Sequence, residues 1–159
     1  KSIFGAGWLK DIADNFAALA PIGTVYGNGI RRTARAVFDT AIAANRAVGA
    51  HGTGISIPAN AIIIGGVVEV NTAFTGEANA ALAIGVNSGV DIVASAAVNG
   101  VPWSTTGQKA IIPKNNTPEL TSIKVSTAAK EITVTVGSAA LLTGKMNIYL
   151  DYYEGDATE

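Results

Sequence analysis

The chain has 159 residues, no cysteine and a formal net charge of −1, and 48% of it is hydrophobic. This length fits one domain with a short appendage. The lack of cysteine excludes disulfides and thiolate metal sites. The balanced charge argues against a nucleic-acid partner, because general phosphate binding needs a basic face. No apolar run approaches the roughly 20 residues of a membrane-spanning helix, so we expect no membrane partner.

Charged residues make up only 14% of the chain, and 18 residues are glycine. A typical soluble domain is about a quarter charged. Two interpretations fit this composition: much of the surface is buried against partners, or the protein has a neutral surface built from small residues. We favour burial against partners, because large uncharged surfaces mark interaction sites.

The first 33 residues differ from the rest of the chain and are predicted to form an N-terminal arm and linker. Apolar residues recur there at helical spacing, namely Trp8, Leu9, Ile12, Phe16, Leu19 and Ala20. Pro21 and Gly23 end the pattern. A helix this short is marginal alone, so its apolar face needs a surface, either its own β domain or a neighbouring subunit. A membrane-surface helix fits less well, because the polar face is not basic.

The four arginines of the chain lie within sixteen positions, at Arg31, Arg32, Arg35 and Arg46. They follow a glycine-rich linker with a strong turn signal at Asn28-Gly29. They form either a solvated basic patch, the usual role of surface charge, or a contact to an acidic partner surface or nucleic acid. Arg31 and Arg32, together with the arm residues Trp8, Leu9, Ile12 and Phe16, are our candidate residues for contact with a partner subunit.

The most β-branched stretch, residues 54–75, is predicted to contain the central strand of a β-sandwich. After Gly66, Val68 and Val70 alternate with Val67 and Glu69, the period-2 pattern of a strand. Pro58 cannot donate to a strand ladder and predicts a corner. The pair Gly65-Gly66 predicts a bulge or bend.

The remaining strands are predicted at residues 34–39, 46–50, 81–86, 90–98, 109–112, 120–125, 131–136 and 145–153. Residues 51–54 are predicted as a turn, and residues 137–144 as a loop with an apolar plug at Leu141-Leu142. Eight or more short strands with turns every 8–12 residues predict an all-β fold, an antiparallel β-sandwich or jelly roll over residues 34–159, preceded by the short helical arm.

The sequence offers no set of residues for catalysis, for a cofactor or for a metal. His51 is the only histidine, and it lies in a glycine-rich segment without a Ser motif around it. The carboxylates near the C-terminus, Asp151, Glu154, Asp156 and Glu159, match neither an EF-hand loop nor a zinc set. We therefore predict that the protein is not an enzyme.

Trp103 is the one tryptophan in a mid-chain loop, next to Pro102. Its ring could serve as a stacking platform for a sugar, which makes this loop a candidate ligand loop. The alternative, which we favour, is a plug that closes one end of the sandwich, because a large apolar ring prefers burial.

Several segments resemble small structural proteins of tailed bacteriophages. They are Ala-Arg-Ala-Val-Phe-Asp at 34–39, Arg-Ala-Val-Gly-Ala-His-Gly at 46–52, Ile-Pro-Ala-Asn-Ala-Ile-Ile at 57–63, Glu-Ile-Thr-Val-Thr-Val at 131–136, Leu-Thr-Gly-Lys at 142–145 and Tyr-Leu-Asp-Tyr at 149–152. Within this group the capsid decoration (cement) proteins match best. The resemblance implies a small β-rich virion component, usually a trimer, that binds the major capsid protein on the outer capsid surface and reaches over it with an N-terminal arm. It implies no catalytic residues.

Two functions of different class follow. In the first, the protein stabilises a capsid by burying apolar and main-chain surface across subunit joints. In the second, it is a head-fibre or tail module that binds a receptor or carbohydrate near Trp103. The residues alone do not decide between a head, neck or tail location.

Overall fold

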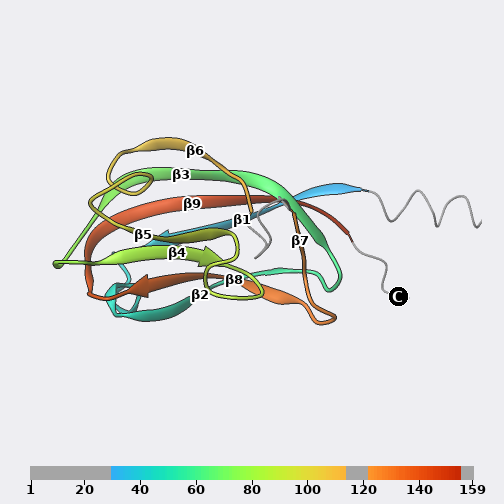
Figure 1. Ribbon diagram of the computed structural model, residues 1–159, viewed down its shortest axis with the longest axis horizontal. Helices are drawn as coiled ribbons and strands as arrows, with labels where there is room; N and C mark the ends of the chain where they lie inside the picture. The colour runs from blue at the N-terminus through green and yellow to red at the C-terminus, as the bar shows by residue number, and fades with distance from the viewer. Residues whose placement is uncertain (1–29, 114–121, 155–159) are drawn as a thin grey trace, which may run out of the picture. The chain divides into compact units, whose positions relative to one another are not determined.

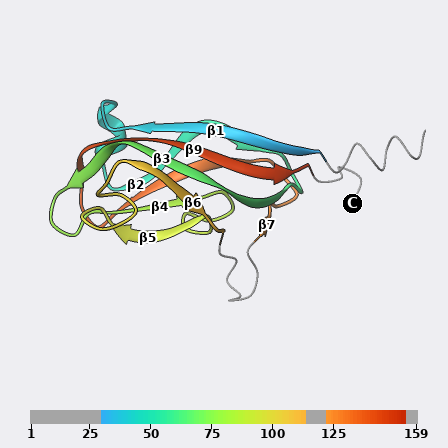
Figure 2. The ribbon, with the colours of Figure 1, turned by 90° about the horizontal axis from the view of Figure 1, so that it is seen from above.

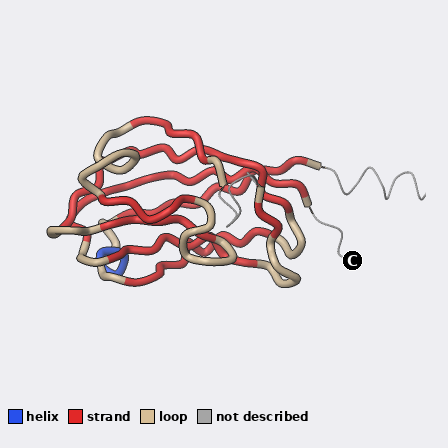
Figure 3. Tube along the Cα trace, viewed as in Figure 1, coloured by secondary structure: helices blue, strands red, loops and turns tan. Residues whose placement is uncertain are grey.

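A computed structural model describes residues 30–113 and 122–154. The predicted arm, with Trp8, Leu9, Ile12 and Phe16, lies outside the described residues, as do residues 114–121 and 155–159. Within the described part, the chain consists of strands joined by loops, with one short 3₁₀ helix (Figures 1 and 3), which confirms the all-β prediction.

The described residues form nine strands and one short 3₁₀ helix. Their bounds are β1 Arg31–Asp39, η1 Ala43–Arg46, β2 Gly49–Ile57, β3 Ile62–Gly76, β4 Ala81–Gly85, β5 Val93–Ala97, β6 Gly107–Ile111, β7 Ile123–Lys124, β8 Lys130–Gly137 and β9 Leu141–Tyr153.

The strands form two antiparallel sheets. Sheet A has the order β1-β9-β3-β6, with β7 pairing the beginning of β3, and sheet B has the order β2-β8-β4-β5. In Figure 2, β1 follows one margin of the sandwich, while β5 and β6 lie at the opposite margin. Among the described strands, β1 lies at one edge of sheet A and β6 and β7 at the other, and β2 and β5 lie at the edges of sheet B.

The core lies between the inner faces of the two sheets and follows the alternation of the sequence. In β8, Ile132, Val134 and Val136 are buried, as the period-2 pattern predicts. In β9 the alternate residues Met146, Ile148, Leu150 and Tyr152 are buried. One apolar face per strand, closed against the other sheet, is the arrangement that gives a sandwich its stability.

The predicted central strand corresponds to β3, an interior strand between β9 and β6. The pairing of β3 with β9 shifts register between Ile63 and Gly65, where a bulge is predicted. A side chain is not tolerated at the next position, because a Cβ on Gly66 would lie 2.0 Å from the carbonyl oxygen of Tyr149. Pro58 lies in the corner between β2 and β3, as predicted.

Two local predictions are wrong. Residues 51–54, predicted as a turn, belong to β2, because pairing with β8 continues through Gly52 and resumes at Ser56 after an irregularity that includes Gly54 at φ +77°. Leu141 and Leu142, predicted in a loop, begin β9, with Leu141 buried and Leu142 exposed as strand alternation requires. In both places the backbone pairs with a neighbouring strand, β8 for residues 51–54 and β3 for Leu141. The glycines near each segment favour a turn or loop in the local pattern, so the strand is not recognised from the segment alone.

Several strand bounds also differ from the prediction. β1 begins at Arg31, three residues before the predicted start of the domain at residue 34. The strand predicted at 46–50 is found at 49–57, and the one predicted at 90–98 is limited to 93–97. β1 begins where Arg31 faces Tyr153 at the end of β9, and β5 is limited to the residues that pair with β4, which a single segment does not reveal.

Candidate functional site

The candidate contact residues Arg31 and Arg32 both form ion pairs with the end of the chain's last strand. The Arg31 guanidinium binds the carboxylate of Asp151, and Arg32 Nε donates to Glu154 Oε1 at 2.6 Å. The register of β1 on β9 brings these pairs together, since Arg31 lies opposite Tyr153. The structure therefore places both arginines at an exposed corner of sheet A, with their charges already compensated.

Asp151 is the carboxylate at the centre of this corner. Its two oxygens accept hydrogen bonds from the hydroxyl of Thr33, at 2.6 Å, and from Arg31. These bonds, the one from Thr33 first and the one from Arg31 second, lower the pKa of Asp151 below its ordinary value. The pKa of Arg31 is raised in turn by its bond to Asp151. At neutral pH the two arginines of this corner are therefore each paired with a negatively charged carboxylate.

A polar network crosses the outer face of sheet A from β1 to β3. Arg35 donates to Asn147 Oδ1 at 3.0 Å, and Asn147 Nδ2 donates to Glu69 Oε2 at 2.8 Å and to Asn71 Oδ1 at 3.1 Å. Asn147 is buried although it lies on the outer face, because its neighbours close over it. The polar side chains of this network are therefore hydrogen-bonded to one another within the chain.

The outer face of sheet B is different, since small and uncharged residues dominate it. The register places Ala50, Thr135 and Ala83 in one row across β2, β8 and β4. The β4–β5 loop lies on part of this face, because a Cβ on Gly85 would meet the carbonyl oxygen of Ser88 at 1.6 Å. Ala83 is therefore fully buried although it points away from the core.

Trp103, the residue of the candidate ligand loop, has an exposed fraction of 0%. Its ring meets Phe74 edge-on, with centroids 6.2 Å apart, and Phe74 stacks on Phe38 at 6.1 Å. The loop is held by a hydrogen bond from the Phe74 amide to the Trp103 carbonyl at 3.0 Å. The ring thus fills the core at this end of the sandwich and presents no open face for stacking.

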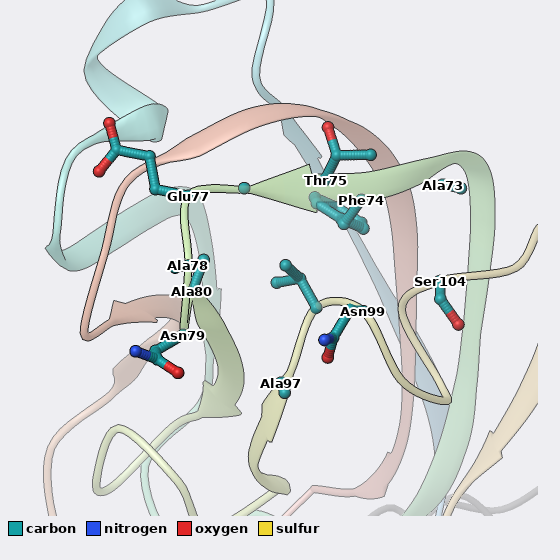
Figure 4. Close-up of a pocket in the computed structure, with 12 residues that line it drawn as sticks. Ala73, Phe74, Thr75, Glu77, Ala78, Asn79, Ala80, Ala97, Asn99 and Ser104 are labelled. Atoms are coloured by element: carbon teal, nitrogen blue, oxygen red, sulfur yellow. The ribbon is translucent and has the colours of Figure 1, made fainter.

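A shallow hollow of about 390 Å³ lies beside this loop, between the end of β3, the β3–β4 turn and the β5–β6 loop (Figure 4). Phe74 is among its lining residues, and the polar ones are Thr75, Glu77, Asn79, Asn99 and Ser104. Figure 4 shows the carboxylate of Glu77 pointing away from the hollow, with Asn79 and Ser104 on opposite sides of it. These groups do not converge on one point, as the groups of a small-molecule site do.

A second hollow of about 300 Å³ is an apolar groove at the margin where β5 and β6 end the two sheets. Every residue that lines it is isoleucine, valine, alanine or proline. The two most exposed large hydrophobic residues of the described chain are Ile112, at 64%, which lines the groove, and Val101, at 75%, which precedes the lining residue Pro102. Sequence analysis missed this groove, and the only signal for it was two apolar residues next to prolines, at positions 101–102 and 112–113.

His51 lies on β2, where Nε2 is 2.7 Å from the carbonyl oxygen of Ala47 and the ring contacts Phe38. Among residues 30–113 and 122–154, no three His, Asp or Glu side chains are grouped so as to hold a metal ion. No helix in the same residues is long and apolar enough to cross a membrane.

Comparison with known proteins gives a likeness of fold. No family model and no curated protein matches the sequence. Among solved structures, the chain is similar to one from the acid-stable capsid of Helicobacter pylori bacteriophage KHP30, with a TM-score of 0.54 and 12% identity over 79% of this chain and 89% of that one. It is also similar to a chain in the capsid asymmetric unit of cyanophage Pam1, with a TM-score of 0.55 and 15% identity over 80% of this chain and 86% of that one. The fold of this protein therefore occurs in the capsids of two phages.

Proposed function

We propose that the protein is a structural component of a phage virion, a capsid decoration protein that binds the outer surface of the major capsid shell as a homotrimer. The observation that carries this proposal is the likeness of fold to chains of two phage capsids, which covers about four fifths of the sequence in each case. The segments that resemble phage structural proteins in the sequence lie within the same β domain.

The strand order supports a jelly roll. Sheet A takes β1, β9, β3 and β6, and sheet B takes β2, β8, β4 and β5. Four strands from the first half of the domain thus interleave with four from the second half in two packed sheets, as in the double Greek key of viral capsid domains. Fold alone does not imply function, so the assembly role needs its own test.

A decoration protein stabilises a shell by mass action. It binds the assembled shell and not the separate subunits, so every bound copy adds its binding free energy to the assembled state. Such a role needs a rigid body and contact surfaces, and no reacting group. The packed core and the exposed apolar residues at the domain margins fit these needs.

The candidate contact residues have different parts in this proposal. The apolar arm residues Trp8, Leu9, Ile12 and Phe16 bury surface on a neighbouring subunit. Arg31 and Arg32, already paired with carboxylates, lie at the rim of the contact, where charges affect the association rate more than the affinity.

The test is attachment to purified shells of the phage that encodes the protein. The full chain should sediment with shells and raise their disassembly temperature, and a chain lacking residues 1–29 should remain folded but not attach. This deletion leaves β1 intact, because β1 begins at Arg31. Light scattering of the full chain should give three times the 16.1 kDa chain mass. Absence of shell binding by the full chain would refute the decoration role.

The second candidate is a head-fibre or tail module that binds a carbohydrate. The observation in its favour is the hollow beside the Trp103 loop, with the amides of Asn79 and Asn99 on its wall. A glycan array distinguishes it, since a decoration protein should show no glycan binding, and a receptor-binding module should bind a defined glycan and lose it in Asn99→Ala.

A further inference from the structure

We propose that the apolar groove between β5 and β6 receives the N-terminal arm of a second copy of this chain, so that the protomers of the assembly exchange arms. This inference rests on the proposed homotrimer and identifies the surface that holds it together. It goes beyond that function in naming both the receptor surface and its occupant.

The groove has the chemistry of a surface that another chain covers. Its walls come from Ile92, Val93 and Ala96 on one side and from Ala110 and Ile112 on the other, with no polar or ionisable side chain among the lining residues. The charge nearest along β6 is Lys109, and its Nζ donates to the carbonyl oxygens of Thr105 and Thr106 at the far end of the strand. The side chains that line the groove offer water no hydrogen bond, so covering them with apolar side chains is favourable.

Three parts of the chain lie outside the described residues, and only one of them matches the groove. Residues 114–121 contain one large apolar side chain, Leu120, and residues 155–159 contain none. Residues 8–20, in contrast, place Trp8, Leu9, Ile12 and Phe16 at the spacing of one helical face. A helix of this length is marginal alone and needs a partner surface.

The length of residues 21–29 lets the arm reach its own groove as well as a neighbour's, and the proposed homotrimer is the reason for assigning it to a second copy. The arm meets the domain at Ile30, next to β1, and the groove lies at the opposite margin, three strand spacings or about 14 Å away across sheet A. In a ring of identical protomers joined through unlike surfaces, the β1 margin of one protomer faces the β5–β6 margin of the next. The nine residues 21–29 span up to about 30 Å, enough to deliver the arm into the neighbour's groove.

A disulfide test reads this contact directly, because the chain has no cysteine of its own. The full chain carrying Ile12→Cys and Ile112→Cys should form covalent dimers and trimers on mild oxidation, seen on a non-reducing gel. Mixing the two single variants should give a linked dimer. The matched control pairs Ile12→Cys with Leu142→Cys, a residue of similar exposure, 54% against 64%, outside the groove. It should give at least tenfold less linked product.

Each other outcome overturns the inference. A disulfide within one chain would mean that the arm covers its own groove, and equal linking through Leu142→Cys would mean random collision. Absence of any disulfide would mean that the arm lies elsewhere, as on the shell. As a second readout, Ile112→Asp should lower the mass in solution threefold, while Leu142→Asp should leave it unchanged, with circular dichroism confirming the fold of both.

The proposed function and this inference fail separately. Linked trimers in solution without attachment to shells would refute the decoration role and leave arm exchange in place. Attachment to shells without any link through Ile112→Cys would refute arm exchange and leave the decoration role in place.

Discussion

The two sheets of the sandwich bury similar apolar faces but have very different outer faces. Among the described strands, those of sheet A carry nine charged residues and those of sheet B carry two. The nine are Arg31, Arg32, Arg35, Asp39, Glu69, Lys109, Lys124, Lys145 and Asp151, and the two are Lys130 and Glu131. The charged residues of the described strands are therefore concentrated in sheet A.

Part of this contrast has a cause inside the chain. Part of the outer face of sheet B is covered by the β4–β5 loop, which needs small residues beneath it. Asp91 holds that loop by accepting hydrogen bonds from the amides of Val86 and Asn87 at 2.8 and 3.0 Å. Low surface charge thus does not by itself mark a partner surface, and the apolar groove at the β5–β6 margin is a more specific indication.

The largest expected effect comes from the core, where the two sheets are alike. Ile84→Ala in sheet B and Ile148→Ala in sheet A each empty a fully buried position. Each should lower the free energy of unfolding by about 2–5 kcal/mol, measured by urea denaturation. A loss under about 1 kcal/mol at either site would mean that this sheet does not share the common core.

The next effect tests the covered face of sheet B. Gly85→Ala drives a Cβ into the backbone of the β4–β5 loop and should cost about 1–3 kcal/mol of stability. Gly100→Ala is the matched control, because its Cβ would approach only the carbonyl oxygen of Ala97, at 3.7 Å. If both variants are equally stable, the loop does not press on the sheet.

A smaller effect tests the polar network of sheet A. Asn147→Ala removes one hydrogen bond to Arg35 and one each to Glu69 and Asn71, at a buried position. It should cost about 1–2 kcal/mol, since each partner loses a bond that solvent replaces only in part. Ser95→Ala, on the exposed edge strand of sheet B, should change stability by less than about 0.5 kcal/mol. Equal effects would show that the network adds nothing to stability.

The smallest effect is the pH dependence that comes from two carboxylates, Asp151 and Asp39, near opposite ends of the β1–β9 pairing. The pKa of Asp151 is lowered by Thr33 and Arg31, and the pKa of Asp39 by the Ala41 amide and then by Lys145. A lowered folded pKa contributes stability above the unfolded value of about 3.9, and this contribution is lost as pH falls through the folded pKa. Asp151→Asn should therefore flatten the fall in thermal midpoint below about pH 4. A steeper fall in the variant would contradict this sign.

Much of the strand framework follows from local pattern. The alternation of residues 131–136 and 145–153 predicts β8 and most of β9 because the burial of one face imposes period 2 on any strand. Pro58 and Gly65-Gly66 predict a corner and a bulge because proline lacks an amide donor and glycine lacks a Cβ. The prediction of a turn at residues 51–54 is wrong because it rests on the two glycines, whereas pairing with β8 makes the segment part of a strand.

The sequence by itself determined an all-β domain, its main strands, its buried faces and the absence of cysteine chemistry, because these depend on spacing and residue type along one segment. Only the tertiary structure decided which strands share a sheet, where the β4–β5 loop lies and that Trp103 is enclosed by Phe74. Only it brought Ile92, Ala96 and Ala110 together as one groove. These features bring together residues that are far apart in the chain. Their stability depends on which strands pair with each other, and the pattern within one segment does not contain that information.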